Sequence, residues 1–196
     1  MFSLISCKEV KTVIEKSKFF SFSYNCYSIE EQNKILKEIK RNNLSATHIC
    51  YASIIYKNND VLCYSSDDGE PSGTAGLQIL QALKENNMIN VLCVVVRYFG
   101  GIKLGVAGLG RAYKECALKT ISDNRCEVKL KKLYYVTCDY NQYNILKSYF
   151  VKNNIQISDL VFNNGVNFNV YLTQEDAINI KDKINFLSEK DDIKYC

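Results

Sequence analysis

Two short segments carry side chains whose types and spacing would suit catalysis. His48 and Cys50 lie two residues apart in THICYASIIYK, so a strand would place a potential base and a potential thiol nucleophile on one face. Asp67, Asp68 and Glu70 follow in DDGEPSGTAG, and paired carboxylates can hold a metal ion. These residues define one hypothesis, a hydrolase or a phosphate- or nucleotide-binding enzyme.

The same residues also have a non-catalytic interpretation. A lone histidine on a strand more often bonds to a neighbouring carboxylate or backbone group, and proximity to His48 does not by itself activate a thiol. With one histidine, nine cysteines and no CxxC spacing, the sequence predicts reduced structural thiols and no bound metal or cofactor.

A third segment, RYFGGIKLGVAGLGRAY, is rich in glycine and positive charge. Eight of the nine glycines and the only proline fall between Gly69 and Gly110, and no acidic residue separates Arg97 from Arg111. A helix that begins near residues 105–108 would present free N–H groups and a positive dipole end to a phosphate. The predicted anion- or nucleic-acid-binding residues are Arg97, Gly100, Gly101, Lys103, Gly105, Gly108 and Arg111.

An internal ion network is the alternative for these charges. The acidic segment has the opposite sign, so the two glycine-rich segments could dock, with glycines allowing close approach of the backbones. Both interpretations can hold together. Tyr98, Phe99 and Tyr113 would stack on bases if exposed, or belong to the core. A kinase-like phosphate loop is disfavoured, because GVAGLGRA lacks the required hydroxyls and lysine.

Composition limits the class of protein. An apolar content of 47% is ample for packed cores, and the net charge of +4 permits nucleic-acid contact without a polybasic tail. The sequence has no apolar run of about 20 residues and no secretory signal pattern. We expect a cytoplasmic protein with no membrane partner, and its oligomeric state is left open.

Hydrophobic periodicity predicts an α+β protein with two domains, residues 1–127 and 128–196. For the first domain we expect strands within 10–24, a helix capped by Ser28 and a strand pair around a turn at 58–60. These are followed by a helix at 75–85, a buried strand at 89–99 and a further helix. The second domain is predicted to have the order βαββαβ, which is typical of a ferredoxin-like sandwich. Its expected elements are strand 128–140, helix 142–153, strands 155–162 and 166–173, helix 175–189 and a short terminal strand.

The segments ATHICYA, DDGEPSGTAG and RYFGGIKLGVAGLGRAY together resemble the IMPACT/YigZ family. The resemblance covers most of the first domain and implies a fold like domain 2 of ribosomal protein S5, followed by a ferredoxin-like domain. The sequence departs from the family pattern at Ile49, Gln78 and Ala107, and none of these changes removes a charge.

The family resemblance implies a role linked to translation, since eukaryotic IMPACT proteins compete for an activator of a translation-initiation kinase. We therefore expect a non-enzymatic regulator that binds RNA, the ribosome or a translation-associated protein through the basic glycine-rich surface. The hydrolase or nucleotide-binding hypothesis remains the alternative.

Overall fold

The computed structural model describes residues 1–57, 60–181, 183–184 and 186–195. The chain divides into two compact units, Met1–Glu127 and Val128–Cys196. Each unit has its own hydrophobic core.

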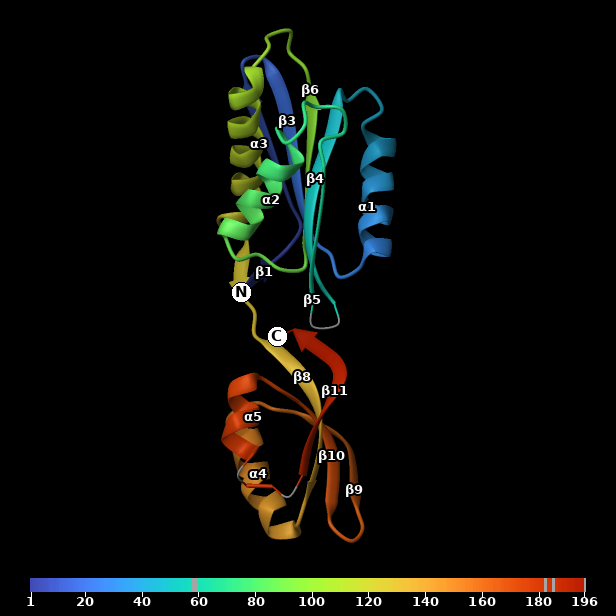
Figure 1. Cartoon of the computed structure of the whole chain (residues 1–196), viewed down its shortest axis with the longest axis vertical. Coiled ribbons are helices and arrows are strands. Elements are labelled where there is room, and N and C mark those ends of the chain that lie inside the picture. The colour runs from blue at the N-terminus through green and yellow to red at the C-terminus, as the bar shows by residue number, and fades with distance from the viewer. Residues whose placement is uncertain (58–59, 182, 185, 196) are drawn as a thin grey trace. The chain divides into compact units, whose positions relative to one another are not determined.

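A five-stranded antiparallel sheet forms the centre of the first unit (Figure 1). Its strands, in the order in which they pair, are β2 (Lys8–Ile14), β3 (Ser17–Asn25), β6 (Val91–Tyr98), β4 (His48–Lys57) and β5 (Asp60–Ser66). The uniformly apolar strand expected at 89–99 is the central strand β6, where Val91 through Arg97 are all buried. Part of the turn expected at 58–60 lies outside the described residues.

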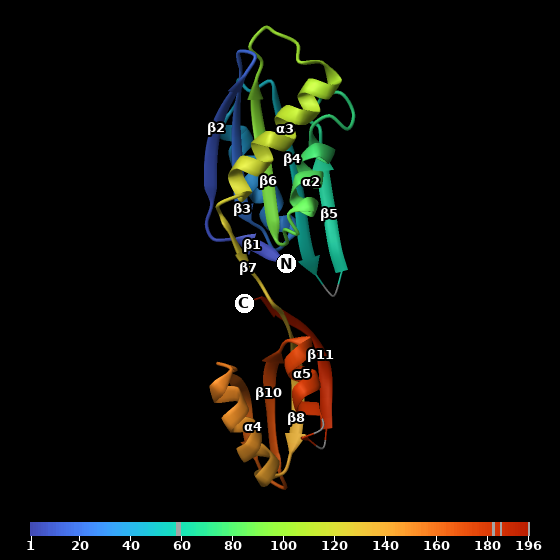
Figure 2. The same cartoon turned by 90° about the vertical axis from the view of Figure 1, so that its left-hand side faces the viewer.

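Helices cover both faces of this sheet. α2 (Gly76–Glu85) and α3 (Gly105–Ile121) lie side by side on one face, and α1 (Ile29–Asn42) lies on the other (Figures 1 and 2). The cap predicted at Ser28 is confirmed, because its hydroxyl accepts a hydrogen bond from the Glu31 backbone N–H at 3.1 Å.

Strand alternation separates two cores around this sheet. On β4, Cys50 and Ala52 pack in the cluster that includes residues of α2 and α3, whereas Ile49 and Ile55 pack in the cluster that includes residues of α1. Residues two apart on a strand share a face. His48 and Cys50 therefore lie on the α2/α3 face of the sheet.

A short strand pair in this unit was not predicted. β1 (Phe2–Leu4) pairs antiparallel with β7 (Arg125–Glu127), so the beginning of the first unit is bonded to its end. Each strand has only three residues, which is too short for a periodic pattern to be visible in the sequence.

The second unit has the predicted element order. It consists of β8 (Leu130–Cys138), α4 (Tyr140–Lys152), β9 (Ile157–Phe162), β10 (Val166–Leu172), α5 (Gln174–Lys181) and β11 (Phe186–Tyr195). The antiparallel sheet has the order β11-β8-β10-β9, and both helices lie on the same side of it (Figure 1).

One predicted helix is too long. The helix expected over 175–189 ends at Lys181 as α5, and the last residues of that range belong to β11. β11 pairs with β8 from Phe186 to Tyr195, apart from one irregularity, so non-local hydrogen bonding overrides the local helical pattern.

The whole chain is a mixed α+β protein with antiparallel sheets. Within the described ranges, no helix is both long and apolar enough to cross a membrane.

Candidate functional site

The acidic segment caps helix α2 through the side chain of Asp67. One carboxylate oxygen accepts a hydrogen bond from the Gly73 N–H at 2.9 Å, and the other accepts from Ala75 and Gly76 at 2.9 and 2.8 Å. Burial alone would raise the pKa of Asp67, but these three backbone donors outweigh it and lower the pKa. The carboxylate of Asp67 therefore serves as the cap of the α2 N-terminus.

Ser72 and Thr74 do not replace Asp67 as the cap of α2. Ser72 and Thr74 precede α2 at positions that often cap helices, yet Thr74 donates its hydroxyl proton to the Pro71 carbonyl at 2.6 Å. Gly76 also allows the helix to approach β5, since a Cβ there would lie 2.7 Å from the Ser66 backbone. The long-range cap by Asp67 fits this close approach.

A buried ion pair forms the centre of the site. Arg97 Nη1 donates to Glu70 Oε1 at 2.6 Å, and the hydroxyl of Tyr113 donates to the same oxygen at 2.8 Å. The side chains of Arg97 and Glu70 are only 5% and 3% exposed. Burial is the largest of the causes that raise the pKa of Tyr113, so its hydroxyl stays protonated as a donor.

Three further residues contact Arg97. Its Nη2 lies 3.4 Å from the Ser17 hydroxyl, and its guanidinium lies within 5.6 Å of the ring centres of both Phe19 and Phe99. The internal ion network considered from the sequence thus describes Arg97 and Glu70. Arg97 therefore pairs with Glu70 inside the fold and is not part of an exposed surface.

Asp68 bonds to the backbone of β4 instead of to an arginine. Its carboxylate accepts a hydrogen bond from the Ile49 N–H at 2.7 Å, and Lys40 Nζ lies 3.8 Å from its other oxygen. The acidic segment is therefore attached to β4 at this point.

The geometry at His48 and Cys50 does not resemble a nucleophile and its base. His48 Nδ1 is 2.9 Å from the Asp68 carbonyl and its Nε2 is 3.9 Å from Glu70 Oε2. The Cys50 thiol is fully buried and donates to the Asp67 carbonyl at 3.0 Å, and burial raises its pKa to about 12. A thiolate is strongly disfavoured at neutral pH in this environment.

Metal binding finds no support in the same residues. In the part of the chain that the structure describes, no group of three or more His, Cys, Asp or Glu side chains is arranged to hold a metal ion. The Asp67 oxygens face backbone donors rather than an open site.

The basic glycine-rich segment begins helix α3 in a different way. α3 starts at Gly105, within the predicted range, and its N-cap residue Leu104 makes no side-chain hydrogen bond to the helix. The first turn contains no acidic residue, and Val106 in that turn is 67% exposed. The N–H groups of this turn are therefore open to an external acceptor.

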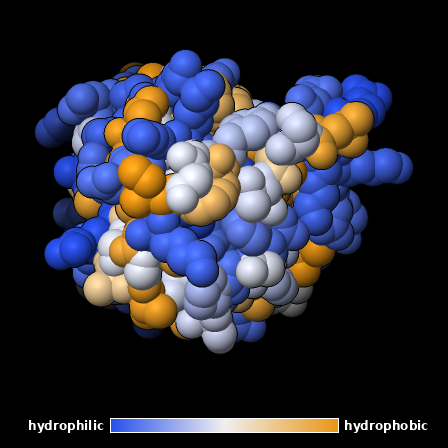
Figure 3. Space-filling model, turned by 90° about the horizontal axis from the view of Figure 1, so that it is seen from above, coloured by the Kyte–Doolittle hydropathy of each residue, from blue (hydrophilic) through white to orange (hydrophobic). Residues whose placement is uncertain are grey.

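Cations flank this helix end. Lys103 precedes α3 and Arg111 lies in its second turn, and both are exposed. Neither side chain has a hydrogen bond or ion pair to another described residue. Seen from the end of the first unit at which this loop lies, the surface is mainly hydrophilic with scattered hydrophobic side chains (Figure 3).

The four glycines predicted to bind an anion or nucleic acid have different structural roles. Gly100 packs against the turn before β3, since a Cβ there would lie 2.1 Å from the Lys16 backbone. Gly101 and Gly105 are exposed with φ of +88° and +68°, and both would have open space beside a Cβ. Gly108 is half-buried in the first helical turn. Gly101 and Gly105 thus lie at the surface, whereas Gly100 has a packing role.

Tyr113 is one of three aromatic residues whose role the sequence left undecided between base stacking and the core. It is completely buried, and its hydroxyl completes the contacts of Glu70. Leu109, Ala112 and Cys116 form a buried face of α3 at helical spacing, and nothing in such a spacing indicates a carboxylate partner for Tyr113.

The fold and site define a two-unit α+β protein whose first unit combines a buried Glu–Arg–Tyr network with an open helix terminus. Residues 15–121 match the family described as the Impact N-terminal domain. The IMPACT family member YvyE of Bacillus subtilis is 31% identical over 195 residues, which cover 98% of this chain and 89% of the relative. The chain therefore belongs to the IMPACT family.

Other comparisons agree with this assignment. An IMPACT family member of Haemophilus influenzae is 34% identical over 161 residues, covering 81% of this chain and 76% of that protein. A crystal structure described as that of a hypothetical protein is 25% identical, has a TM-score of 0.64 and covers 93% of this chain and 89% of its own. The similarity to bacterial members spans nearly the full chain.

Proposed function

We propose that this protein is a non-enzymatic, translation-associated regulator that binds RNA through the N-terminal end of α3. The proposed contact surface consists of Lys103, Arg111 and the exposed backbone around Gly101 and Gly105. Family membership favours a translational role, with the ribosome or a translation-associated protein as the assembly in which the RNA contact is made. The two units are proposed to be an S5 domain 2-like fold and a ferredoxin-like fold, respectively.

The observation that carries this proposal is the open terminus of α3. A helix N-terminus without an acidic or side-chain cap retains a positive partial charge, and Lys103 and Arg111 add full charges on either side of it. RNA phosphates are anions that can satisfy the N–H groups and the cations together. A binding role also agrees with the buried, protonated state of Cys50, which removes the nucleophile of the enzymatic alternative.

A charge-removing double variant tests the proposal. In Lys103→Gln/Arg111→Gln, two phosphate-neutralising groups are lost, so affinity for ribosomes or ribosomal RNA fragments should fall about tenfold or more. The slope of log affinity against log salt should decrease by about 1.4 for single-stranded RNA. Fluorescence anisotropy at several salt concentrations gives both quantities.

Helix α1 offers a matched control. Lys34→Gln/Arg41→Gln removes one lysine and one arginine from exposed positions on the helix that covers the opposite face of the sheet. This variant should bind RNA like the unmodified protein. Equal binding by both double variants would reject the proposed surface, and loss of RNA affinity without a change of salt slope would show that Lys103 and Arg111 do not contact phosphates.

A further inference from the structure

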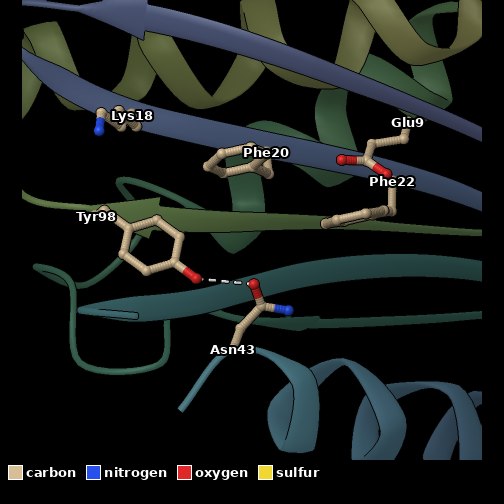
Figure 4. Close-up of a pocket in the computed structure, with 6 residues that line it drawn as sticks. All are labelled: Glu9, Lys18, Phe20, Phe22, Asn43 and Tyr98. Atoms are coloured by element: carbon tan, nitrogen blue, oxygen red, sulfur yellow. Dashed lines mark hydrogen bonds between the residues drawn. The ribbon is translucent and has the colours of Figure 1, made fainter. Parts of the chain in front are cut away.

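A groove on the α1 face of the first sheet is separate from the site described above. It has a volume of about 380 Å³ and is lined by Glu9, Lys18, Phe20, Phe22, Asn43 and Tyr98. Figure 4 shows Phe20 and Phe22 along β3, with Tyr98 from β6 and Asn43 from the end of α1 on the other side. The groove therefore has an aromatic floor beside the end of a helix.

The floor of the groove is fixed in position. Phe20 and Tyr98 make an edge-to-face contact with ring centres 5.7 Å apart, and the Tyr98 hydroxyl donates to Asn43 Oδ1 at 2.8 Å. Asn43 in turn donates from its amide nitrogen to the Ile39 carbonyl at 2.9 Å. Phe20, Phe22 and Tyr98 are each half-buried, so each ring is held by the core and still reaches the surface.

The charges of the groove lie at its two ends. Lys18 and Glu9 are both exposed and lie at opposite ends of the row of phenylalanines (Figure 4). Glu9 is paired in register with Phe22, four residues along β3 from Lys18, which corresponds to about 13 Å. Lys11, paired with Phe20, adds a second cation whose Nζ lies 5.6 Å from the ring centre.

This arrangement matches the chemistry of a nucleotide. An aromatic floor offers stacking to a base, a lysine at one end can contact a phosphate, and a carboxylate at the other end accepts hydrogen bonds from exocyclic amino groups. The length of the groove accommodates one or two nucleotides. An apolar peptide side chain would use the floor but would leave both charged ends unmatched.

We propose that this groove binds a base of single-stranded RNA, with Phe20 and Phe22 as stacking residues, Lys18 as the phosphate contact and Glu9 as the acceptor for an amino-bearing base. The site is distinct from the open terminus of α3, although a hydrogen bond links the two segments. Gly100 of the glycine-rich segment donates its N–H to Ser17 at 3.2 Å, and Ser17 immediately precedes Lys18.

Short oligonucleotides test the groove. Hexamers of adenosine or cytidine should bind the full chain more tightly than a uridine hexamer, because uracil has no exocyclic amino group. Phe20→Leu keeps an apolar side chain in the core but removes the ring, and should weaken binding about fivefold or more. Glu9→Ala should reduce the preference over uridine.

Charge variants locate the phosphate contact. Lys18→Gln should reduce the salt slope by about 0.7, whereas Lys37→Gln, an equal change at an exposed position on α1, should leave it unchanged. A dinucleotide titration followed by amide NMR signals should shift residues of β3 and β6 around the groove. This second measurement does not depend on the folding of any variant.

The outcomes separate this proposal from the proposed function. If Phe20→Leu binds hexamers like the unmodified protein, or if the dinucleotide shifts signals elsewhere only, the groove proposal is overturned. If Lys103→Gln/Arg111→Gln loses ribosome binding while Phe20→Leu keeps hexamer binding, the open terminus of α3 stands and the groove does not. Loss of hexamer binding in Phe20→Leu alone supports the groove independently.

Discussion

The N-termini of α2 and α3 follow two glycine-rich segments and are satisfied in opposite ways. At α2, the carboxylate of Asp67 accepts three backbone hydrogen bonds from residues 73, 75 and 76. At α3, neither a side-chain cap nor a first-turn acid is present, and lysine and arginine side chains flank the helix end. Two segments that are both rich in glycine therefore differ in what the backbone N–H groups at the following helix terminus face.

The difference separates a segment whose charges lie inside the fold from one whose charges are mostly exposed. The acidic segment directs all three of its carboxylates into the fold, to a helix terminus, to the backbone of β4 and to Arg97. Of the three cations in the basic segment, Arg97 lies in that interior, while Lys103 and Arg111 remain at the surface. Arg97 is thus neutralised inside the fold, whereas the charges of Lys103 and Arg111 stay at the surface.

The largest effect in this comparison should come from the buried contact between the two segments. Glu70→Ala leaves the Arg97 guanidinium buried without its carboxylate and the Tyr113 hydroxyl without its acceptor. We expect a loss of about 3–5 kcal/mol in the free energy of unfolding. Urea denaturation followed by circular dichroism measures this loss.

Two controls accompany that measurement. Glu85→Ala removes an exposed carboxylate that pairs with Lys114 and should leave the urea midpoint almost unchanged. Glu70→Gln/Arg97→Met removes both buried charges and should lose less than the sum of its single changes. Strict additivity would show that Glu70 and Arg97 contribute independently rather than as a pair.

Much of the fold follows from periodicity, but the site depends on contacts between distant residues. The alternation of β4 predicted that His48 and Cys50 share a face, and the apolar run of β6 predicted a buried strand. The sequence did not predict that Asp67 caps a helix beginning nine residues later, because caps are recognised at adjacent positions.

Long-range pairing accounts for the other differences. Glu70 is 27 residues from Arg97 and 43 from Tyr113, so their common contact requires the tertiary fold. Likewise, residues 186–189 at the start of β11 follow a helical pattern, and only their pairing with β8 makes them part of a strand. Local patterns describe an element's own preference and contain no information about its partner.

An intermediate effect is expected from removing the cap of α2. Asp67→Ala leaves three N–H groups without their acceptor and should cost about 1–2 kcal/mol of stability. The folded-state pKa of Asp67 is lowered relative to the unfolded chain, whose value is about 3.9. The carboxylate therefore stabilises the fold above the unfolded pKa, and this contribution disappears as the pH falls through the folded-state pKa.

Denaturation at several pH values checks both the size and the sign. The stability difference between the unmodified protein and Asp67→Ala should be full near pH 7 and should shrink below about pH 4. Asp123→Ala, at an exposed position just beyond α3, should show no comparable dependence. A difference for Asp67→Ala that grows on acidification would contradict the capping role.

The smallest change in stability should come from supplying α3 with the negative charge that α2 already has. Val106 is exposed in the first turn, where an acidic side chain interacts favourably with the helix dipole. Compared with Val106→Gln, which has nearly the same shape and no charge, Val106→Glu should gain about 0.3–1 kcal/mol in the free energy of unfolding. The same charge should repel phosphate, so Val106→Glu should bind RNA more weakly than Val106→Gln in anisotropy measurements. A stability gain together with unchanged RNA affinity would show that the open terminus of α3 is not the contact, since a carboxylate beside a bound phosphate cannot be neutral to its binding.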